Sequence, residues 1–267
     1  MKKKLVVIGA GMASGRMLEQ LFDAAPDAWD VTLFNAEPRG NYNRLMLSPV
    51  LSGEKTYDQI VTHDDTWYAT HCVDCRFGEP VVRIDRKNRV VYSNSGGAPY
   101  DALVIATGSA PFIIPVVGKD LPGVVTYRDL EDTQAMMATE GKDAVVIGGG
   151  LLGLEAAAGM AARGARVTVI HLMGHLMERQ LDKTAGTLLQ SALESRGLKF
   201  LLPKQTAELI GNDEGRVKAV RFADGEVIPA DLVVMAAGIR PNSELAEQAG
   251  LPCNRGILVN DTLQTYD

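Results

Sequence analysis

An α/β fold with two doubly wound parallel sheets is predicted by three observations. An apolar run at 4–8 is followed by a glycine turn, a helical pattern and a second apolar run at 31–34. The same order of run, glycine turn, helix and run begins again at 143. Short apolar runs that alternate with helices are typical of strands buried on both faces of a parallel sheet. One architecture is therefore repeated along the chain.

The first repeat is completed by a helix and further strands. The helix after the glycine turn places four large apolar side chains on one side and ends before Pro26. Residues 41–53 are expected to form a loop. Three prolines within 111–122 indicate a linker and a domain boundary. The other predicted elements are a short strand at 73–77, a hairpin of 81–84 and 89–92, and a buried strand at 102–106.

The second repeat follows the same plan after the linker. An alanine-rich helix comes directly after its glycine turn and is closed by Gly164. A second amphipathic helix is predicted to end at Gly197. The elements expected in this half are strands at 143–147, 167–170, 207–210, 217–222 and 232–236, and helices at 155–162 and 181–196.

Composition and charge exclude several classes of function. The 267 residues are 46% hydrophobic and 22% charged, with a net charge of −6 and no long basic run. Nucleic-acid binding therefore has no electrostatic support. The N-terminal apolar run, 5–8, is too short for a signal sequence or a membrane span, so the cytoplasm is the expected location and no membrane partner is expected.

The cysteines and histidines give little support for a redox dithiol or a metal site. Cys72 and Cys75 form a C-x-x-C, but Cys75 is predicted to lie in a short strand and Cys72 just before it. Redox pairs usually lie at the start of a helix, and no helix is predicted to follow. No second C-x-x-C is present. His171 and His175 lie four residues apart without the carboxylate and third ligand of a metal site. No metal is predicted.

Both glycine turns have the form that binds a dinucleotide. The first glycine permits a tight turn, the second lets the backbone approach a pyrophosphate, and a small third residue lets the helix pack on the strand. The start of the helix then presents free N–H groups to the phosphates. The first turn contains Gly9, Gly11 and Ser14, and the second contains Gly148, Gly150 and Gly153.

The residue just past the second strand of each repeat bears on which ribose is bound. Glu37 stands in the first repeat where a carboxylate accepts hydrogen bonds from ribose hydroxyls, although a solvated loop glutamate is the alternative. His171 takes this place in the second repeat. A neutral imidazole can bond a hydroxyl, and a protonated one could tolerate a 2′-phosphate. The sequence leans toward NADH and leaves NADPH open.

Further motifs carry a resemblance to a known family. The two glycine turns, ATGS at 106–109 and AGIRPN at 237–242 resemble the pyridine nucleotide-disulfide oxidoreductase superfamily. NYNRLMLS at 41–48 looks like the Y-x-R-x-x-L-S signature of its ferredoxin- and rubredoxin-reductase branch. Residues 171–182 are similar to the N-terminal region of the large subunit of assimilatory NAD(P)H-nitrite reductases, and 109–112 and 255–260 agree with that branch. The resemblance covers essentially the whole chain.

The resemblance implies an FAD-dependent NAD(P)H oxidoreductase. Its nicotinamide domain, 114–239, would be inserted into an FAD domain made of 1–113 and 240–267. NADH would pass hydride to FAD, and electrons would go on to an acceptor. That acceptor would be an iron–sulfur and siroheme centre of a longer parent protein or a separate subunit. A stand-alone ferredoxin or rubredoxin reductase and a non-catalytic nucleotide-binding fragment remain alternatives.

The resemblance also implies which residues form the sites. Glu155 matches a family glutamate close to the nicotinamide and the flavin, and a simple helix-start charge is the alternative reading. The residues implied for FAD are Gly9, Gly11, Ser14, Glu37, Arg44, Ser48, Val81, Thr107 and Gly108. Those implied for NADH are Gly148, Gly150, Leu151, Leu152, Gly153, His171, Arg179 and Gly238.

Three departures from the family pattern matter. Pro49 replaces a lysine that often lies near the flavin, so a lysine–glutamate pair cannot form. No C-x-x-C lies in the helix after the first turn, which excludes a disulfide-reductase mechanism. The chain ends at Asp267, before the family's usual Y-A-x-G-D/E strand, and FAD retention is the expectation that this departure affects most. Nitrite reduction by these residues alone is expected to be absent, and the oligomeric state is left open.

Overall fold

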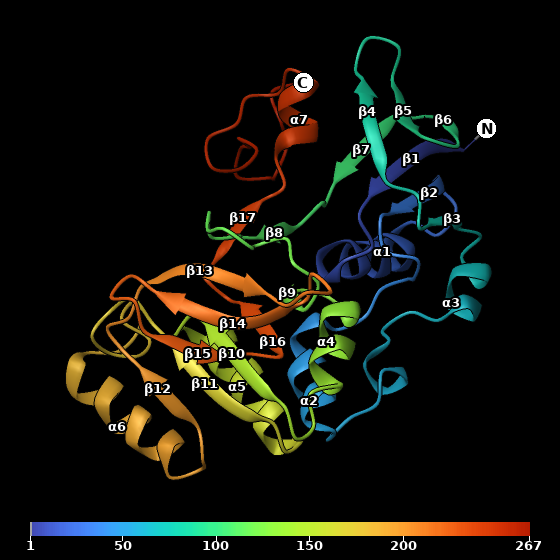
Figure 1. Ribbon diagram of the computed structural model, residues 1–267. Coiled ribbons are helices and arrows are strands. Elements are labelled where there is room, and N and C mark those ends of the chain that lie inside the picture. Colours follow the sequence, from blue (N-terminus) through green and yellow to red (C-terminus); the bar gives the residue numbers. More distant parts are fainter. Residues whose placement is uncertain (1) are drawn as a thin grey trace. The chain divides into compact units, whose positions relative to one another are not determined.

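The computed structural model describes residues 2–267, and the chain divides into two compact units (Figure 1). The first unit runs up to Arg44 and continues over Asp58–Ala110 and Arg240–Asp267. The second unit consists of Leu45–Tyr57 and Pro111–Ile239. The segment Leu45–Tyr57 therefore groups with the second unit, whereas the sequence analysis placed it in the first domain.

The first unit is built on a parallel sheet of the order β3-β2-β1-β7. Its strands are β1 (Lys3–Ile8), β2 (Trp29–Asn35), β3 (Asp74–Phe77) and β7 (Ala102–Ile105). Leu5 and Val7 pack with the helix α1 (Met12–Ala24). Val6 and Ile8, which alternate with them, pack with an antiparallel meander of β4 (Val81–Asp85), β5 (Val90–Ser93) and β6 (Gly96–Pro99).

The second unit repeats this plan with five parallel strands in the order β12-β11-β10-β16-β9. The strands are β9 (Val124–Thr126), β10 (Asp143–Ile147), β11 (Arg166–Ile170), β12 (Lys199–Leu201) and β16 (Leu232–Met235). Val145 and Ile147 share a core with the meander of β13 (Thr206–Gly211), β14 (Val217–Phe222) and β15 (Val227–Pro229). The helix α5 (Leu151–Ala162) also contacts β10 (Figure 1). The predicted α/β class with two doubly wound sheets is confirmed.

Each sheet has a switch point at the strand that leads into its glycine turn. The chain leaves β1 toward β2 on one side and returns as β7 on the other, and β10 lies in the same way between β11 and β16. Open parallel sheets bind ligands outside the carboxyl ends of the strands at such a point. The two glycine turns begin at these ends, directly after Ile8 and Ile147.

The expectation that residues 41–53 form a loop is wrong. A 3-10 turn, Arg44–Met46, leads into the helix α2 (Leu47–Ser52). Pro49 lies in the first turn of this helix, where a missing backbone N–H costs nothing. Gly53 ends it with a φ of 86°. The helix buries Leu47, Val50 and Leu51 and packs against α5, because Gly159 of α5 leaves room for Leu51.

Several other elements differ from the sequence expectation. α5 begins at Leu151, four residues early, because Gly150 acts as its N-cap. α6 (Lys183–Glu194) is shorter at both ends than expected. Elements not predicted from the sequence are α3 (Asp65–Thr70), α4 (Leu130–Met137), α7 (Glu244–Gln248), the 3-10 turn Asp58–Ile60, and the strands β6, β8 (Ser109–Pro111), β9, β12, β15 and β17 (Ile239–Pro241). No helix among residues 2–267 combines the length and apolarity needed to cross a bilayer.

Candidate functional site

The glycine turn of the second unit leaves open space where a ligand could lie. A Cβ on Gly148 would meet the carbonyl oxygen of Ala236 at 2.3 Å, and the φ of Gly148 is +134°. A Cβ on Gly153 would meet the carbonyl oxygen of Gly148 at 2.1 Å. A Cβ on Gly150, in contrast, would meet nothing within 4 Å. The outer two glycines are therefore required by the fold, and Gly150 keeps a surface of the turn open.

The first unit has the same arrangement around its own turn. Gly9 has a φ of +105°, and its Cβ would meet the carbonyl oxygen of Ala106 at 2.3 Å. A Cβ on Gly11 would meet nothing within 4 Å. Ser14 is buried, and its hydroxyl donates to the carbonyl of Gly11 at 3.0 Å. Serine is thus accommodated at the third position by a bond to the turn itself.

The helices that follow the two turns differ from the other long helices at their N-termini. Asp129 caps α4 and Asp182 caps α6 with a side-chain oxygen. The N-caps of α1 and α5 are Gly11 and Gly150, which have no side chain, and neither helix has an acid in its first turn. The free N–H groups and the positive end of the dipole are left for an external anion. The residues present therefore fit a pyrophosphate at each turn.

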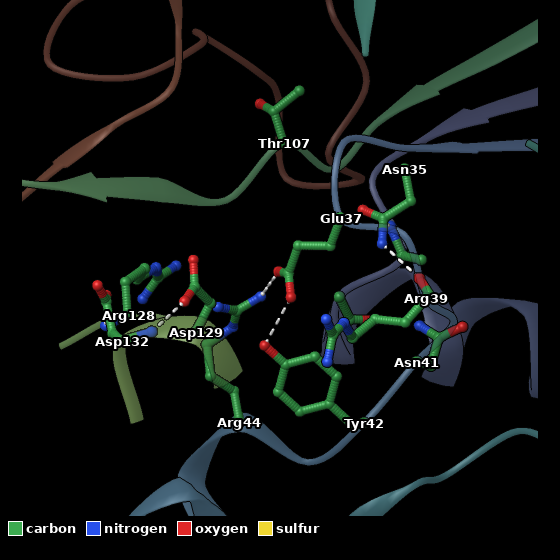
Figure 2. A network of polar contacts seen from close by, with 12 residues as sticks. Asn35, Glu37, Arg39, Asn41, Tyr42, Arg44, Thr107, Arg128, Asp129 and Asp132 are labelled. Carbon is green, nitrogen blue, oxygen red and sulfur yellow. Dashed lines mark hydrogen bonds and ion pairs between the residues drawn. The ribbon is translucent and has the colours of Figure 1, made fainter. Parts of the chain in front are cut away.

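Glu37 is held by two neighbours from the segment that follows it (Figure 2). The hydroxyl of Tyr42 donates to Oε2 of Glu37 at 2.9 Å, and Nη2 of Arg44 lies 2.5 Å from Oε1. The Glu37 side chain keeps 24% of its surface exposed. Each carboxylate oxygen has a second lone pair, so Glu37 can still accept from a ribose. The spacing of Tyr42 and Arg44 in the Y-x-R signature is thus explained by a shared partner.

Two asparagine side chains form hydrogen bonds with the backbone of the first glycine turn, and neither was predicted from the sequence. Asn41 is fully buried, and its Nδ2 donates to the carbonyl of Gly11 at 2.5 Å. Its backbone N–H donates to the hydroxyl of Tyr68 at 2.9 Å. Oδ1 of Asn35 accepts from the N–H of Ala10 at 3.3 Å. Asn41 stands in the quoted signature, but no spacing rule indicates that its side chain points to the turn.

Thr107 and Gly108 border a cleft in the first unit. The Thr107 hydroxyl donates to the carbonyl of Asn242 at 2.8 Å, and Nδ2 of Asn242 donates back to the carbonyl of Thr107 at 2.9 Å. Their cleft has a volume of about 180 Å³ and lies at the carboxyl end of β7. Val81 lies apart from this cleft, half-buried at the start of β4, where it packs on the core of the unit.

His171 contacts the second glycine turn directly. The N–H of Gly149 donates to its Nδ1 at 3.1 Å, and its Nε2 lies 3.0 Å from Oε2 of Glu178. Because Nδ1 accepts, the ring proton sits on Nε2 and is donated to Glu178. The side chain is 10% exposed. Both ring nitrogens are thus engaged by the protein, a role that the sequence position alone did not indicate.

Glu155 belongs to a chain of hydroxyl groups within the second unit. The Ser48 hydroxyl donates to Oε2 of Glu155 at 2.6 Å, and the Tyr127 hydroxyl donates to Ser48 at 3.0 Å. Burial raises the pKa of Tyr127 to about 12. Ser48 of helix α2 is therefore the hydrogen-bond donor to Glu155, and the next residue, Pro49, cannot provide a lysine partner. Tyr127 carries no motif and could not have been found from the sequence.

The remaining residues predicted to bind NADH lie at the start of α5, after β16 and beside Glu178. Leu151 and Leu152 form the start of α5 and are 58% and 38% exposed. A Cβ on Gly238 would meet nothing within 4 Å, and its φ is +120°. Arg179 is exposed and follows Glu178. The structure brings the glycines, the two leucines and His171 to one end of the sheet.

The three cysteines form no disulfide. Cys72, Cys75 and Cys253 are free thiols. Burial, followed by the charges of Asp74 and Asp65, raises the pKa of Cys75 to about 12, so it is not a thiolate near neutral pH. Within residues 2–267, no group of three or more His, Cys, Asp or Glu side chains is arranged to hold a metal.

The chain matches one protein family along nearly its whole length. The family model described as pyridine nucleotide-disulphide oxidoreductase matches residues 3–267. The covalent complex of putidaredoxin reductase with putidaredoxin, a solved structure, superimposes with a TM-score of 0.93 at 27% identity. That superposition covers 99% of this chain and 65% of the solved chain.

Two curated relatives are from Bacillus subtilis (strain 168). Nitrite reductase [NAD(P)H] is 50% identical over 267 residues, which cover 99% of this chain and 33% of the relative. The assimilatory nitrate reductase electron transfer subunit is 44% identical over 269 residues, which cover 100% of this chain and 35% of the relative. The chain thus spans about a third of the length of these relatives.

Proposed function

This chain belongs to the pyridine nucleotide-disulphide oxidoreductase family, and we propose that it is the NADH-oxidising flavin module of an assimilatory nitrite reductase. The observation that carries this proposal is the pair of equivalent turns, each with an uncapped helix start and an open glycine, Gly11 and Gly150. Two such turns in one chain suit a protein that binds two dinucleotides at once. The 50% identity to a nitrite reductase supports the choice within the family.

Each unit takes one dinucleotide in this proposal. The first unit binds FAD, with the pyrophosphate at Gly11 and the ribose at Glu37, which Tyr42 and Arg44 orient. The second unit binds NADH, with the pyrophosphate at Gly150. These roles suit the open glycines and the carboxylate, because phosphates need free N–H groups and ribose hydroxyls need an acceptor.

Glu155 is the proposed charged group nearest to the reaction. Bound FAD supplies a hydride acceptor that can release electrons singly. Ser48 fixes the Glu155 carboxylate by a 2.6 Å bond, and Tyr127 fixes Ser48. Loss of hydride leaves nicotinamide with a positive charge, which a carboxylate without an ammonium partner stabilises. The missing lysine at Pro49 thus leaves Glu155 with neutral partners.

The electron acceptor is proposed from the relatives. We place an iron–sulfur and siroheme centre in the part of such a protein that this chain does not cover, or in a partner subunit. A cytoplasmic location is proposed, in keeping with three free thiols and no disulfide among the described residues.

The proposal is tested with the purified chain after incubation with FAD. We expect a flavin absorption spectrum, NADH-dependent reduction of ferricyanide, and no reduction of nitrite without a further domain. Reduction of a ferredoxin or rubredoxin at comparable efficiency would favour a stand-alone reductase. A colourless protein that binds only NADH would overturn the flavin role, and the double turn would then belong to a nucleotide-binding fragment.

A further inference from the structure

The second unit has no carboxylate at the position that Glu37 occupies in the first. The N–H of Gly9 donates to the carbonyl of Phe34, and that of Gly148 donates to the carbonyl of Ile170. Asn35 and His171 are therefore equivalent, and each accepts from the backbone of its own glycine turn. Two residues further on, the first unit has Glu37. The second unit has Met173 there, whose thioether is a poor acceptor for a hydroxyl.

A carboxylate reaches this end of the sheet from another position. Glu178 lies 3.0 Å from Nε2 of His171, which itself bonds the N–H of Gly149 at 3.1 Å. The N–H of Met177 donates to the carbonyl of Gly149 at 2.9 Å, and Met177 has a φ of 51°. Two separate hydrogen-bonded paths therefore tie Glu178 to the residue just before Gly150.

The Glu178 carboxylate is available to a ligand in its charged form. Its side chain is 26% exposed, so a part of it faces outward. Burial raises its pKa, but hydrogen bonds from its own backbone N–H and from His171, with the charge of Arg179, bring the pKa below its usual value. It is therefore ionised near neutral pH.

We propose that Glu178, positioned by His171, is the carboxylate that accepts the adenosine-ribose hydroxyls of NADH and disfavours the 2′-phosphate of NADPH. This inference rests on the proposed binding of NADH to the second unit. His171 acts as a positioning residue, because both of its ring nitrogens already have protein partners. A ribose hydroxyl can donate to a carboxylate, whereas a 2′-phosphate brings a second negative group beside it.

Arg179 would favour NADPH, opposite to Glu178, so the test has to distinguish the effects of these two side chains. It is exposed, it follows Glu178, and its charge acts on Glu178. A guanidinium pairs well with phosphate, so dominance of Arg179 would favour NADPH. The substitutions Glu178→Gln and Arg179→Gln each introduce a neutral side chain of similar size and so remove one charge.

The test uses the full chain and two probes that lack nicotinamide, ADP-ribose and its 2′-phosphate, measured by titration calorimetry. The wild type is expected to prefer ADP-ribose. Glu178→Gln is expected to bind ADP-ribose about tenfold more weakly and to lose most of the preference, because a charged acceptor is lost. His171→Asn should keep the bond to Gly149, as Asn35 does in the first unit, yet release Glu178 and lower the preference. Glu214→Gln, in the exposed turn between β13 and β14, is the matched control and should change nothing.

Two results would overturn the inference while the proposed function stands. In the first, Glu178→Gln binds both probes as the wild type does, with an unchanged circular dichroism spectrum. In the second, Arg179→Gln, and not Glu178→Gln, changes the preference between the probes. Failure of the wild type to bind ADP-ribose at all would instead contradict the proposed function itself.

Discussion

The two kinds of glycine in the second turn allow folding and ligand binding to be separated by single substitutions. Gly148→Ala puts a Cβ at 2.3 Å from a backbone oxygen on a residue with a φ of +134°. Backbone strain of this kind costs about 1–3 kcal/mol, and the forced contact adds to it. We expect a loss of about 3 kcal/mol in the free energy of unfolding and a fall in Tm of about 5–10 °C.

Gly150→Ala should behave in the opposite way. Its Cβ meets nothing within 4 Å, and its φ of −84° suits any residue. Alanine is a poorer N-cap than glycine by several tenths of a kcal/mol, but it restricts the unfolded chain by a similar amount. The Tm is therefore expected to stay within about 2 °C of the wild type.

Gly150→Ala should instead weaken the binding of NADH. A methyl group on the open surface keeps a pyrophosphate away from the N–H groups at the start of α5, and hydrogen bonds to a charged group contribute about 1.5–3 kcal/mol. NADH affinity is expected to fall by about 10- to 100-fold. Thermal unfolding by circular dichroism and NADH titration by fluorescence measure the two effects. Wild-type NADH affinity in Gly150→Ala, or wild-type stability in Gly148→Ala, would contradict these separate roles of the two glycines.

Three further predictions concern other residues. Tyr42→Phe should weaken FAD binding about threefold to tenfold, because Glu37 loses a 2.9 Å donor, and flavin release on dilution measures this. The pKa of Tyr127 lies at about 12, above its value of about 10 in an unfolded chain. Its contribution to stability is therefore complete below pH 10 and is lost as the pH rises toward 12. Over that range the free energy of unfolding, measured with urea, should fall less for Tyr127→Phe than for the wild type. Cys75, with a pKa of about 12, should resist a thiol reagent at pH 8 in the folded chain. The flavin bound to the variant Cys75→Ser should still be reduced by NADH. Rapid labelling of Cys75 would contradict its raised pKa.

The repeated strands and turns could be predicted because they depend on local patterns. Short apolar runs are the signal of strands buried on both faces, and the glycines mark backbone positions that other residues cannot occupy. Helix α2 was hidden by Pro49, which usually interrupts a helix but is tolerated in its first turn. Meander strands such as β15 are too short to give a clear alternation.

The supporting side chains of the site could not be predicted, because their contacts cross long stretches of sequence. Ser48 and Glu155 are 107 residues apart, and Tyr127 reaches Ser48 from a segment without any motif. His171 does follow its strand directly, as predicted, but it is equivalent to Asn35 and not to Glu37. Sequence position also does not tell which way its side chain points. Its contacts with Gly149 and Glu178 follow only from the loop that returns to the turn.

We propose that this one chain binds FAD and NADH together and passes hydride from NADH to FAD. An anaerobic titration of the FAD-loaded chain with NADH, followed by the absorbance of oxidised flavin, tests this most directly. We expect complete bleaching at one NADH per flavin, and a large excess of NADH should be needed for Gly150→Ala. Flavin that stays oxidised while NADH is bound would contradict it.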